Sequence, residues 1–320
     1  MPLTFDLPLE ELYEYRGINP RPPDFDDYWR AGLDELAAVD TNIELMPSEF
    51  QTSFADCFEL YFTGVRGARV HAKLLHPKNG SRGRPGVIQF HGYTGNSGDW
   101  FYKLGLVAQG FTVAALDCRG QGGLSEDTGG VKGTTLTGHI IRGLDDRPEN
   151  MLYRHIFLDT VQLTRVVMDM PEIDAARIGV TGGSQGGALT IACAALEPRI
   201  KLAAPIFPFL SDYKRVWEMD LAKDAYAEIK EFFRRHDPLH EREDALFEQL
   251  GYIDVQHLAP RIRAEVLMSV GLMDTICPPS SQFAAYNKIE AEKSLAIYPD
   301  FGHEELPGTQ DRVFQFLSRL

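Results

Sequence analysis

The sequence predicts an α/β protein built on a mostly parallel central sheet with helices on both faces. From residue 86 onward, short apolar runs alternate with longer segments of helical length and periodicity. The apolar runs are continuous, which is typical of parallel strands that are buried on both faces. A chain of 320 residues is long enough for one large domain of this class, which we expect to span residues 1–320.

The first 50 residues precede this alternation and are expected to form an N-terminal strap, residues 1–50. A helix is predicted within it, because apolar residues recur along one face: Phe25, Tyr28, Trp29, Leu33 and Leu36. Asp24 is expected to cap the start of this helix. Two strands should follow at residues 54–62 and 69–75, separated by a turn at residues 64–67.

The alternating part of the chain supplies the remaining strands and helices. Strands are expected at residues 87–90, 111–116, 178–181, 202–207, 265–270 and 295–298, with helices at 100–109, 156–168 and 185–196. Residues 211–262 interrupt this rhythm, because they are charged and aromatic with helical spacing and no clear strand. We expect this segment to be a helical cap insertion over the carboxyl edge of the sheet, where such sheets bind ligands. The alternative is a solvent-exposed helical insertion that has no functional role.

Composition and charge exclude several kinds of partner. The 32 Lys and Arg against 46 Asp and Glu give a net charge of −14, which argues against nucleic acid and anionic membrane surfaces. No apolar run approaches the length of about 18 residues that spans a bilayer. The first residues lack the basic start and apolar run of a secretory signal. The four cysteines are widely spaced, which predicts buried free thiols and a cytoplasmic location. No group of residues has metal-ligand spacing.

The segment Gly182–Gly187 carries the strongest chemical signal, with the sequence Gly-Gly-Ser-Gln-Gly-Gly. It follows a predicted strand and opens a predicted helix, which is the setting of the nucleophile elbow in an α/β-hydrolase. Ser184 is therefore the expected nucleophile, and the glycines two residues to either side leave room for a tight turn. A glycine-rich turn that binds phosphate is the alternative, although the segment lacks the lysine of a Walker loop.

A serine nucleophile needs a general base, and that base needs an orienting acid. Hydrolases of this fold place the acid and then the histidine after the serine, each in a loop that follows a late strand. Asp274 comes just after the predicted strand at 265–270, and His303 just after the strand at 295–298. We therefore predict Asp274 as the acid and His303 as the base, with Asp300 as the alternative acid.

Stabilising the oxyanion of an ester reaction requires two N–H donors. One is expected from Gln185, directly after the nucleophile, and the other from Tyr93, in the loop after the strand at 87–90. A glycine-rich turn with Tyr93 packed outside the site is the alternative. The segment Arg119-Gly120-Gln121 follows another strand, and we expect it to support the site structurally, with Arg119 forming charge-assisted hydrogen bonds.

Taken together, these motifs resemble those of the acetyl xylan esterase and cephalosporin C deacetylase family, carbohydrate esterase family 7. Five segments carry the resemblance, in the family's order: HGYTG at 91–95, RGQGG at 119–123, GGSQGG at 182–187, DTICPPS at 274–280 and GHE at 302–304. The resemblance extends from residue 5 to residue 320 and includes the strap. Glu304, in the last of these motifs, is expected to support the site.

The resemblance implies specific roles for five residues: Ser184 as nucleophile, Asp274 as acid, His303 as base, and the amides of Tyr93 and Gln185 as oxyanion donors. It also implies a cytoplasmic enzyme that needs no cofactor or metal. Members of the family remove acetyl groups from small sugars, short xylo-oligosaccharides and cephalosporin C. They assemble as hexamers whose active sites face an internal chamber, so a homo-oligomer is expected here.

Three other functions fit parts of the pattern. A peptidase of the same fold would cleave short peptides, but such enzymes often carry a large extra domain that this sequence lacks. A thioesterase or a dienelactone-type hydrolase is the second, although the latter is expected to have cysteine where this chain has Ser184. A non-catalytic binding module is the third, and the complete set of nucleophile, base and acid argues against it.

Overall fold

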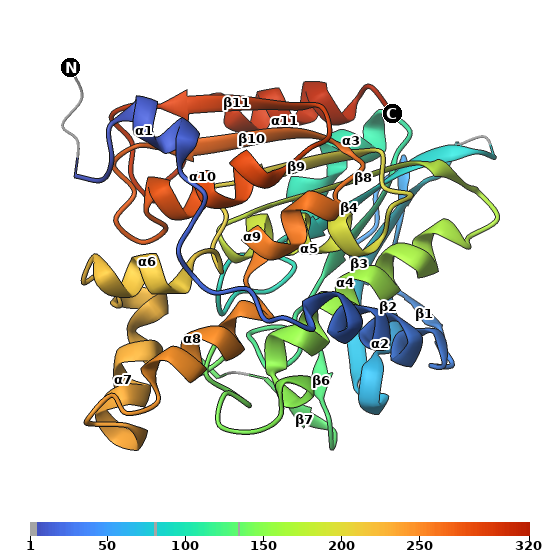
Figure 1. Cartoon of the computed structure of the whole chain (residues 1–320). Coiled ribbons are helices and arrows are strands. Elements are labelled where there is room, and N and C mark those ends of the chain that lie inside the picture. Colours follow the sequence, from blue (N-terminus) through green and yellow to red (C-terminus); the bar gives the residue numbers. More distant parts are fainter. Residues whose placement is uncertain (1–4, 80–81, 134) are drawn as a thin grey trace.

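A computed structural model describes residues 5–79, 82–133 and 135–320, so the first four residues of the expected strap lie outside the described part. The main sheet has nine strands in the order β1-β2-β3-β5-β4-β8-β9-β10-β11 (Figure 1). Its strands are β1 (Glu44–Pro47), β2 (Ala55–Thr63), β3 (Arg69–Pro77), β4 (Arg84–Phe90), β5 (Thr112–Leu116), β8 (Ile173–Gly183), β9 (Leu202–Ile206), β10 (Glu265–Gly271) and β11 (Lys293–Tyr298). Neighbours from β5 to β11 run parallel, and β1, β2 and β3 add an antiparallel edge. The predicted fold class is confirmed.

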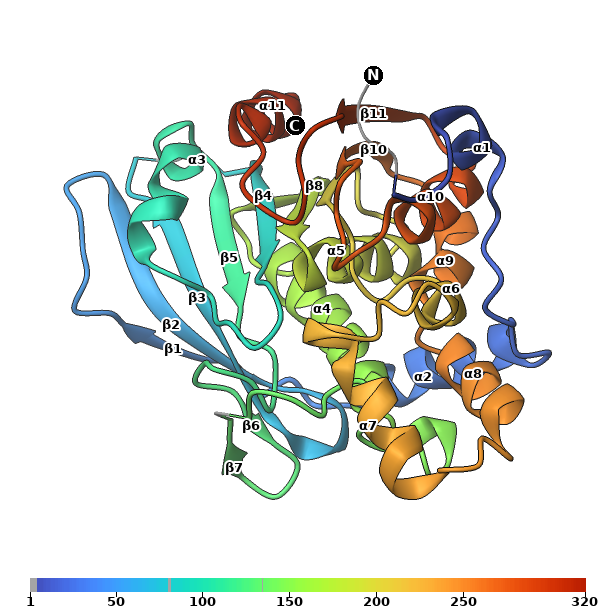
Figure 2. The same cartoon turned by 90° about the vertical axis from the view of Figure 1, so that its left-hand side faces the viewer.

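Helices cover both faces of this sheet (Figure 2). The α-helices are α1 (Leu9–Glu14), α2 (Phe25–Ala37), α3 (Leu104–Ala108), α4 (Leu152–Met168), α5 (Gln185–Leu196), α6 (Tyr213–Glu218), α7 (Ala227–His236), α8 (Glu243–Gly251), α9 (Val255–Leu258), α10 (Pro279–Lys288) and α11 (Thr309–Leu317). Helices α4 and α5 share a core with Ile88 and Ala114, whereas α3 and α11 share one with Val87 and Val113. Successive strand residues thus face opposite cores, which explains the continuous apolar runs.

The described part of the N-terminal segment, residues 5–50, first runs along the outside of the helices, with α1 beside α10 and α2 against α4 (Figure 1). It then forms β1 at the edge of the sheet. Trp29 of α2 is fully buried and stacks on Phe157 of α4, with ring centroids 5.8 Å apart. Its indole Nε1 donates to the Tyr252 carbonyl at 3.0 Å. Asp24 occupies the N-cap position of α2, as expected, but its carboxylate accepts a hydrogen bond from the Tyr252 hydroxyl and makes no capping hydrogen bond.

The boundaries of several elements differ from the prediction. The expected helix at 100–109 begins as a 3₁₀ turn (Trp100–Lys103) before α3, and α4 already begins at Leu152. The short hairpin of β6 (Glu126–Asp127) and β7 (Val131–Lys132), strand β1 and helices α1, α10 and α11 were not predicted. These elements are short, so their hydrophobic periodicity covers too few residues to be distinguished from loops.

The segment at 211–262 contains the helices α6 to α9 and no strand, and it connects β9 to β10. The predicted helical content is therefore observed. Helices α6, α7 and α8 lie beyond the end of the sheet at which β9 leads into this segment (Figure 1). A role for the segment in covering the site and selecting substrate stays a prediction.

A buried carboxylate, Asp212, joins the N-terminal segment to the start of this helical region. It accepts hydrogen bonds from the Tyr15 hydroxyl at 2.7 Å and from the backbone N–H groups of Ile18 and Asn19 at 2.9 and 2.8 Å. The backbone N–H of Asp212 in turn donates to Asp254, and burial together with the Asp212 charge raises the pKa of Asp254 to about 7. The path of the N-terminal segment is therefore fixed by buried polar contacts as well as by apolar packing.

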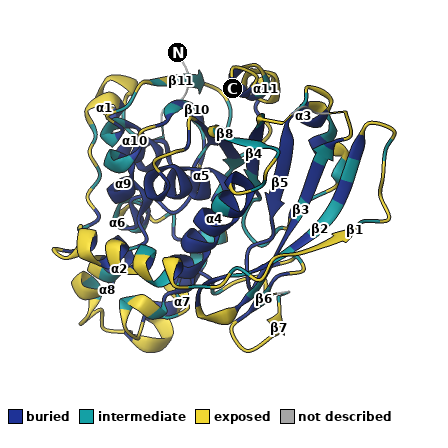
Figure 3. Cartoon of the chain, turned by 90° about the vertical axis from the view of Figure 1, so that its right-hand side faces the viewer, coloured by how far each residue is buried: buried dark blue, intermediate teal, exposed yellow. Residues whose placement is uncertain are grey.

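Burial is concentrated in the central strands and in α4 and α5, while α2 and α8 expose their outer faces (Figure 3). All four cysteines are buried and free, as predicted. Within the described part of the chain, no helix combines the length and the apolar character needed to cross a bilayer.

Candidate active site

The expected nucleophile lies in a strained turn between β8 and α5. Ser184 has φ 56° and ψ −119°, a backbone conformation that L-residues rarely adopt. A Cβ atom added at Gly182 would come within 2.5 Å of the Phe90 carbonyl oxygen, and one at Gly186 within 2.2 Å of the same atom. Glycine is therefore required at both positions for β4, the turn and the start of α5 to approach so closely.

Three side chains predicted from the sequence lie together at this turn. His303 Nε2 lies 2.9 Å from Ser184 Oγ, and His303 Nδ1 lies 2.8 Å from Asp274 Oδ2. Asp274 is fully buried, and its Oδ1 accepts the backbone N–H groups of Ile276 and Cys277 at 2.9 and 2.8 Å. These bonds fix the carboxylate and leave Oδ2 facing the imidazole. The geometry suits an acid that orients a histidine base beside a serine hydroxyl.

The sheet topology explains why Asp274 and His303 meet. They follow β10 and β11, which are parallel neighbours, so both loops emerge at the same edge of the sheet. The alternative acid, Asp300, is exposed, and His303 is hydrogen bonded to Asp274 instead. Glu304 accepts the backbone N–H of Gly302 at 3.0 Å and thereby steadies the loop that carries His303.

The two expected oxyanion donors come from different segments of the chain, the start of α5 and the loop after β4. Gln185 is the first residue of α5, where backbone N–H groups have no partner within the helix. Tyr93 lies in the loop after β4. Among the described residues, neither backbone N–H donates to another group of the chain. Both amides are thus available to a substrate oxygen, which is the requirement for an oxyanion hole.

Gln121 connects the loop after β4, which carries Tyr93, with Gln185 at the start of α5. Its Oε1 accepts the backbone N–H of Thr94 at 3.0 Å, and its Nε2 donates to Gln185 Oε1 at 2.7 Å. The buried Tyr153 hydroxyl donates to the same Gln185 oxygen at 2.7 Å. Gly120, with φ 76°, turns the chain just before Gln121. The side-chain amides therefore hold the loop after β4 against the start of α5.

Arg119 lies in the loop after β5 and is fully buried. Its Nε donates to Asp159 Oδ2 at 2.6 Å, its Nη2 to Asp159 Oδ1 at 2.5 Å and its Nη1 to the Val65 carbonyl at 3.1 Å. Such a bidentate pair has a fixed geometry. It ties the loop after β5, which also carries Gln121, to α4 and to the turn between β2 and β3. A supporting role of Arg119 in the site stays a prediction.

One group of described residues presents ligand atoms close enough to hold a metal ion: Asp274, Cys277 and His303, within 4.8 Å of one another. The chemistry of this group does not suit a metal. Both imidazole nitrogens of His303 already have hydrogen-bond partners. Burial raises the pKa of the Cys277 thiol well above its usual range, and the negative charge of Asp274 raises it further. Metal ligation, by contrast, requires the thiolate.

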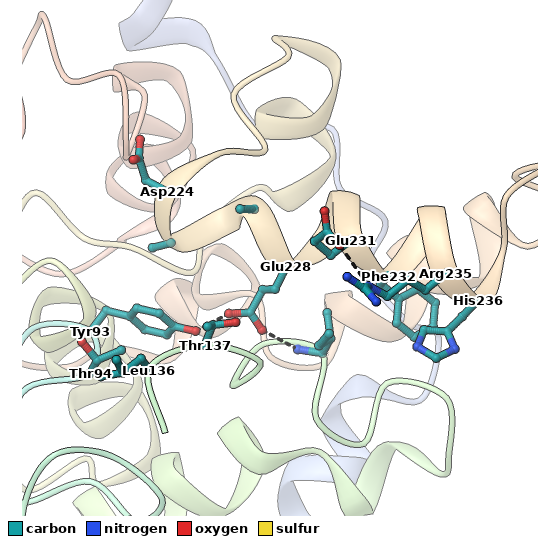
Figure 4. Close-up of a pocket in the computed structure, with 13 residues that line it drawn as sticks. Tyr93, Thr94, Leu136, Thr137, Asp224, Glu228, Glu231, Phe232, Arg235 and His236 are labelled. Carbon is teal, nitrogen blue, oxygen red and sulfur yellow. Dashed lines mark hydrogen bonds and ion pairs between the residues drawn. The ribbon is translucent and has the colours of Figure 1, made fainter. Parts of the chain in front are cut away.

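A cavity of about 500 Å³ opens beside Tyr93, between α7 and the loop before α4 (Figure 4). Its lining mixes apolar and charged side chains: Tyr93, Thr94, Leu136, Thr137, Ile141, Asp224, Ala225, Ala227, Glu228, Glu231, Phe232, Arg235 and His236. Tyr93 is predicted from its motif, whereas Glu228, which accepts a hydrogen bond from the Tyr93 hydroxyl, is not. No motif marks Glu228, and only the packing of α7 brings it to the site.

The chain is similar to known acetyl xylan esterases in both sequence and fold. The sequence matches the acetyl xylan esterase (AXE1) family over residues 1–320. The crystal structure of acetyl xylan esterase 1 from a Thermoanaerobacterium species is 60% identical, with a TM-score of 0.95 over 98% of this chain and 99% of that one. An acetyl xylan esterase from a Paenibacillus species is 34% identical, with a TM-score of 0.92 over the same shares.

A more distant curated relative has a longer chain. It is an acetyl esterase of Xylanibacter ruminicola, 27% identical over 284 residues, which are 87% of this chain. The present chain spans 62% of the length of that relative. With the match to the family over its whole length and the 60% identical solved structure, this chain belongs to the acetyl xylan esterase family.

Proposed function

We propose that this protein is a serine esterase that removes acetyl groups from small acetylated carbohydrates, such as xylo-oligosaccharides and acetylated sugars, and from cephalosporin C. The observation that carries the proposal is the hydrogen-bonded chain from Ser184 through His303 to Asp274 in a member of the acetyl xylan esterase family. The 60% identical solved relative, itself an acetyl xylan esterase, supports the substrate class.

In the proposed reaction, His303 takes the proton of the Ser184 hydroxyl as the oxygen attacks the acetyl carbonyl. Asp274 holds the imidazole in the tautomer that can accept this proton. The backbone amides of Tyr93 and Gln185 stabilise the negative charge on the carbonyl oxygen. The alcohol leaves with the proton from His303, which gives an acetyl-enzyme. Water then attacks through the same groups and releases acetate, so no step requires a metal or cofactor.

A cavity next to one of the proposed oxyanion donors supports a small substrate. It has about 500 Å³ and is lined by Tyr93, although not by Ser184, Asp274 or His303. Cavities of roughly 300–1,000 Å³ commonly hold small-molecule ligands. By resemblance to the family, we further propose a cytoplasmic homohexamer with active sites facing an internal chamber, which would exclude polymers. The free buried cysteines are consistent with a reducing compartment.

Steady-state hydrolysis of 4-nitrophenyl acetate, butyrate and octanoate tests this proposal, together with acetate release from acetylated xylose and from cephalosporin C. We expect kcat/KM to fall steeply beyond acetate, because the proposed substrates carry only acetyl groups. We also expect both acetylated xylose and cephalosporin C to release acetate. Preference for octanoate, or no release from the sugar ester, would contradict the deacetylase assignment while leaving a general esterase.

A further inference from the structure

Glu228 is a buried acidic residue in the first turn of α7, a helix that also carries exposed charged residues. Its exposed fraction is 4%, whereas Glu231, one turn further along, has an exposed side chain. Burial raises the pKa of the Glu228 carboxyl. Burying such a group is unfavourable unless its hydrogen bonds compensate, so its partners are informative.

The carboxylate of Glu228 joins three separate segments of the chain (Figure 4). One oxygen accepts a hydrogen bond from the hydroxyl of Tyr93, which lies in the loop after β4. The other accepts the backbone N–H groups of Ile140 and Ile141, in the loop before α4, at 2.7 and 3.0 Å. All three donors are neutral, so the contact is a bridge between α7 and the two loops rather than an ion pair.

Tyr93 is held at both of its ends. The ring packs edge-on against Phe209 and His139, with centroids 5.6 and 5.2 Å away, and the hydroxyl ends on Glu228. On the backbone side, the next residue, Thr94, donates its N–H to Gln121. Only two rotatable bonds, χ1 and χ2, separate a tyrosine ring from its backbone. Because the hydroxyl and the ring of Tyr93 are both held by neighbours, the orientation of its backbone is restricted.

We propose that Glu228 is a positioning residue of the oxyanion hole: it anchors the Tyr93 hydroxyl and thereby aims the Tyr93 backbone N–H at the carbonyl oxygen of the ester. The inference rests on the proposed function, because it assigns Glu228 a part in the same esterase site. It gives the helical segment at 211–262 a mechanical link to the reaction, through α7, without requiring Glu228 to touch substrate. An oxyanion donor stabilises the transition state only if it points at the position that the charged oxygen takes up. A small displacement of the amide therefore reduces transition-state stabilisation more than it reduces substrate affinity.

The test compares wild-type protein with Glu228→Gln, Tyr93→Phe and the double variant. Loss of one oxyanion donor lowers kcat by about 10²–10³-fold. Glu228→Gln should only misplace the Tyr93 N–H, so we expect it to lower kcat for 4-nitrophenyl acetate by about ten- to a hundredfold. KM should change by less than about threefold. Inactivation by an organophosphonate should slow by a similar factor, because its adduct places an oxygen in the same hole. The double variant should have the same kcat as Glu228→Gln alone, since the Tyr93 hydroxyl acts through its hydrogen bond to Glu228.

Glu248→Gln is the matched control, because it makes the same chemical change at an exposed site on α8. We expect it to retain wild-type kcat and wild-type inactivation rates. If Glu228→Gln does not fold, Tyr93→Phe, which removes only the hydroxyl, decides the question by the same two measurements. The proposal is overturned if kcat and the inactivation rate per titrated site are unchanged while only thermal stability falls. A wild-type protein without esterase activity would instead refute the proposed function itself.

Discussion

Replacing Ser184 with alanine is expected to lower kcat for 4-nitrophenyl acetate on the order of 10⁶-fold, as removal of the nucleophile does in serine hydrolases. The variant keeps His303, Asp274 and the two amides but has no atom to form the acetyl-enzyme. Substrate binding should change little, because the hydroxyl is a small part of the surface that contacts substrate. The measurement is kcat and KM from steady-state rates at high enzyme concentration.

Ser318→Ala serves as the control for Ser184→Ala. Ser318 is exposed at the end of α11, so the same chemical change there should leave kcat at the wild-type value. Thermal unfolding of both variants should match the wild type, since alanine can occupy the turn at 184 with the same backbone strain that serine has. A Ser184→Ala variant that retains a tenth of the wild-type activity would refute the nucleophile assignment.

Replacing Asp274 with asparagine is expected to lower kcat by about 10⁴-fold, the loss typical of the acid in such a triad. Asparagine keeps the volume and one carbonyl oxygen, so the bonds from Ile276 and Cys277 to that oxygen can persist. Its amide then faces His303 Nδ1 and favours the tautomer with the proton on Nε2, which cannot accept the serine proton. The loss should therefore appear in kcat rather than in KM.

Asp300→Asn is the natural comparison, because Asp300 is the alternative acid that the sequence offers near His303. It is exposed, and we expect its replacement to leave kcat within about twofold of the wild type, as is usual for a surface change away from the chemistry. Near-normal turnover of Asp274→Asn combined with a large loss in Asp300→Asn would transfer the role of orienting acid to Asp300.

Local sequence predicts the parts of this molecule that depend on neighbours in the chain. The apolar runs that form β4, β5, β8, β9 and β10 could be found because strands buried on both faces have continuous apolar sequences. The loops with Asp274 and His303 could be placed near Ser184 because parallel strands end at one edge of the sheet. The glycines at 182 and 186 indicated the elbow because a side chain at either would meet Phe90.

Long-range polar contacts could not be predicted in the same way. Asp24 has the residue type and location of a helix cap, yet the Tyr252 hydroxyl, far along the chain, takes its carboxylate. Asp212 and Glu228 hold the N-terminal segment and the Tyr93 loop, respectively, but their partners are set by how separate helices pack. No spacing in the sequence distinguishes Glu228 from the exposed glutamates of the same region.

Detection of an acetyl group on Ser184 tests the proposed mechanism most directly, because every residue role in it serves to form this acetyl-enzyme. Rapid mixing with excess 4-nitrophenyl acetate followed by acid quench should give a burst of 4-nitrophenol, since acylation by this activated ester outpaces deacylation. Peptide mass analysis of the quenched protein should then find one acetyl group, on Ser184. Steady turnover without a burst and with the acetyl group on another residue, or on none, would contradict the central claim.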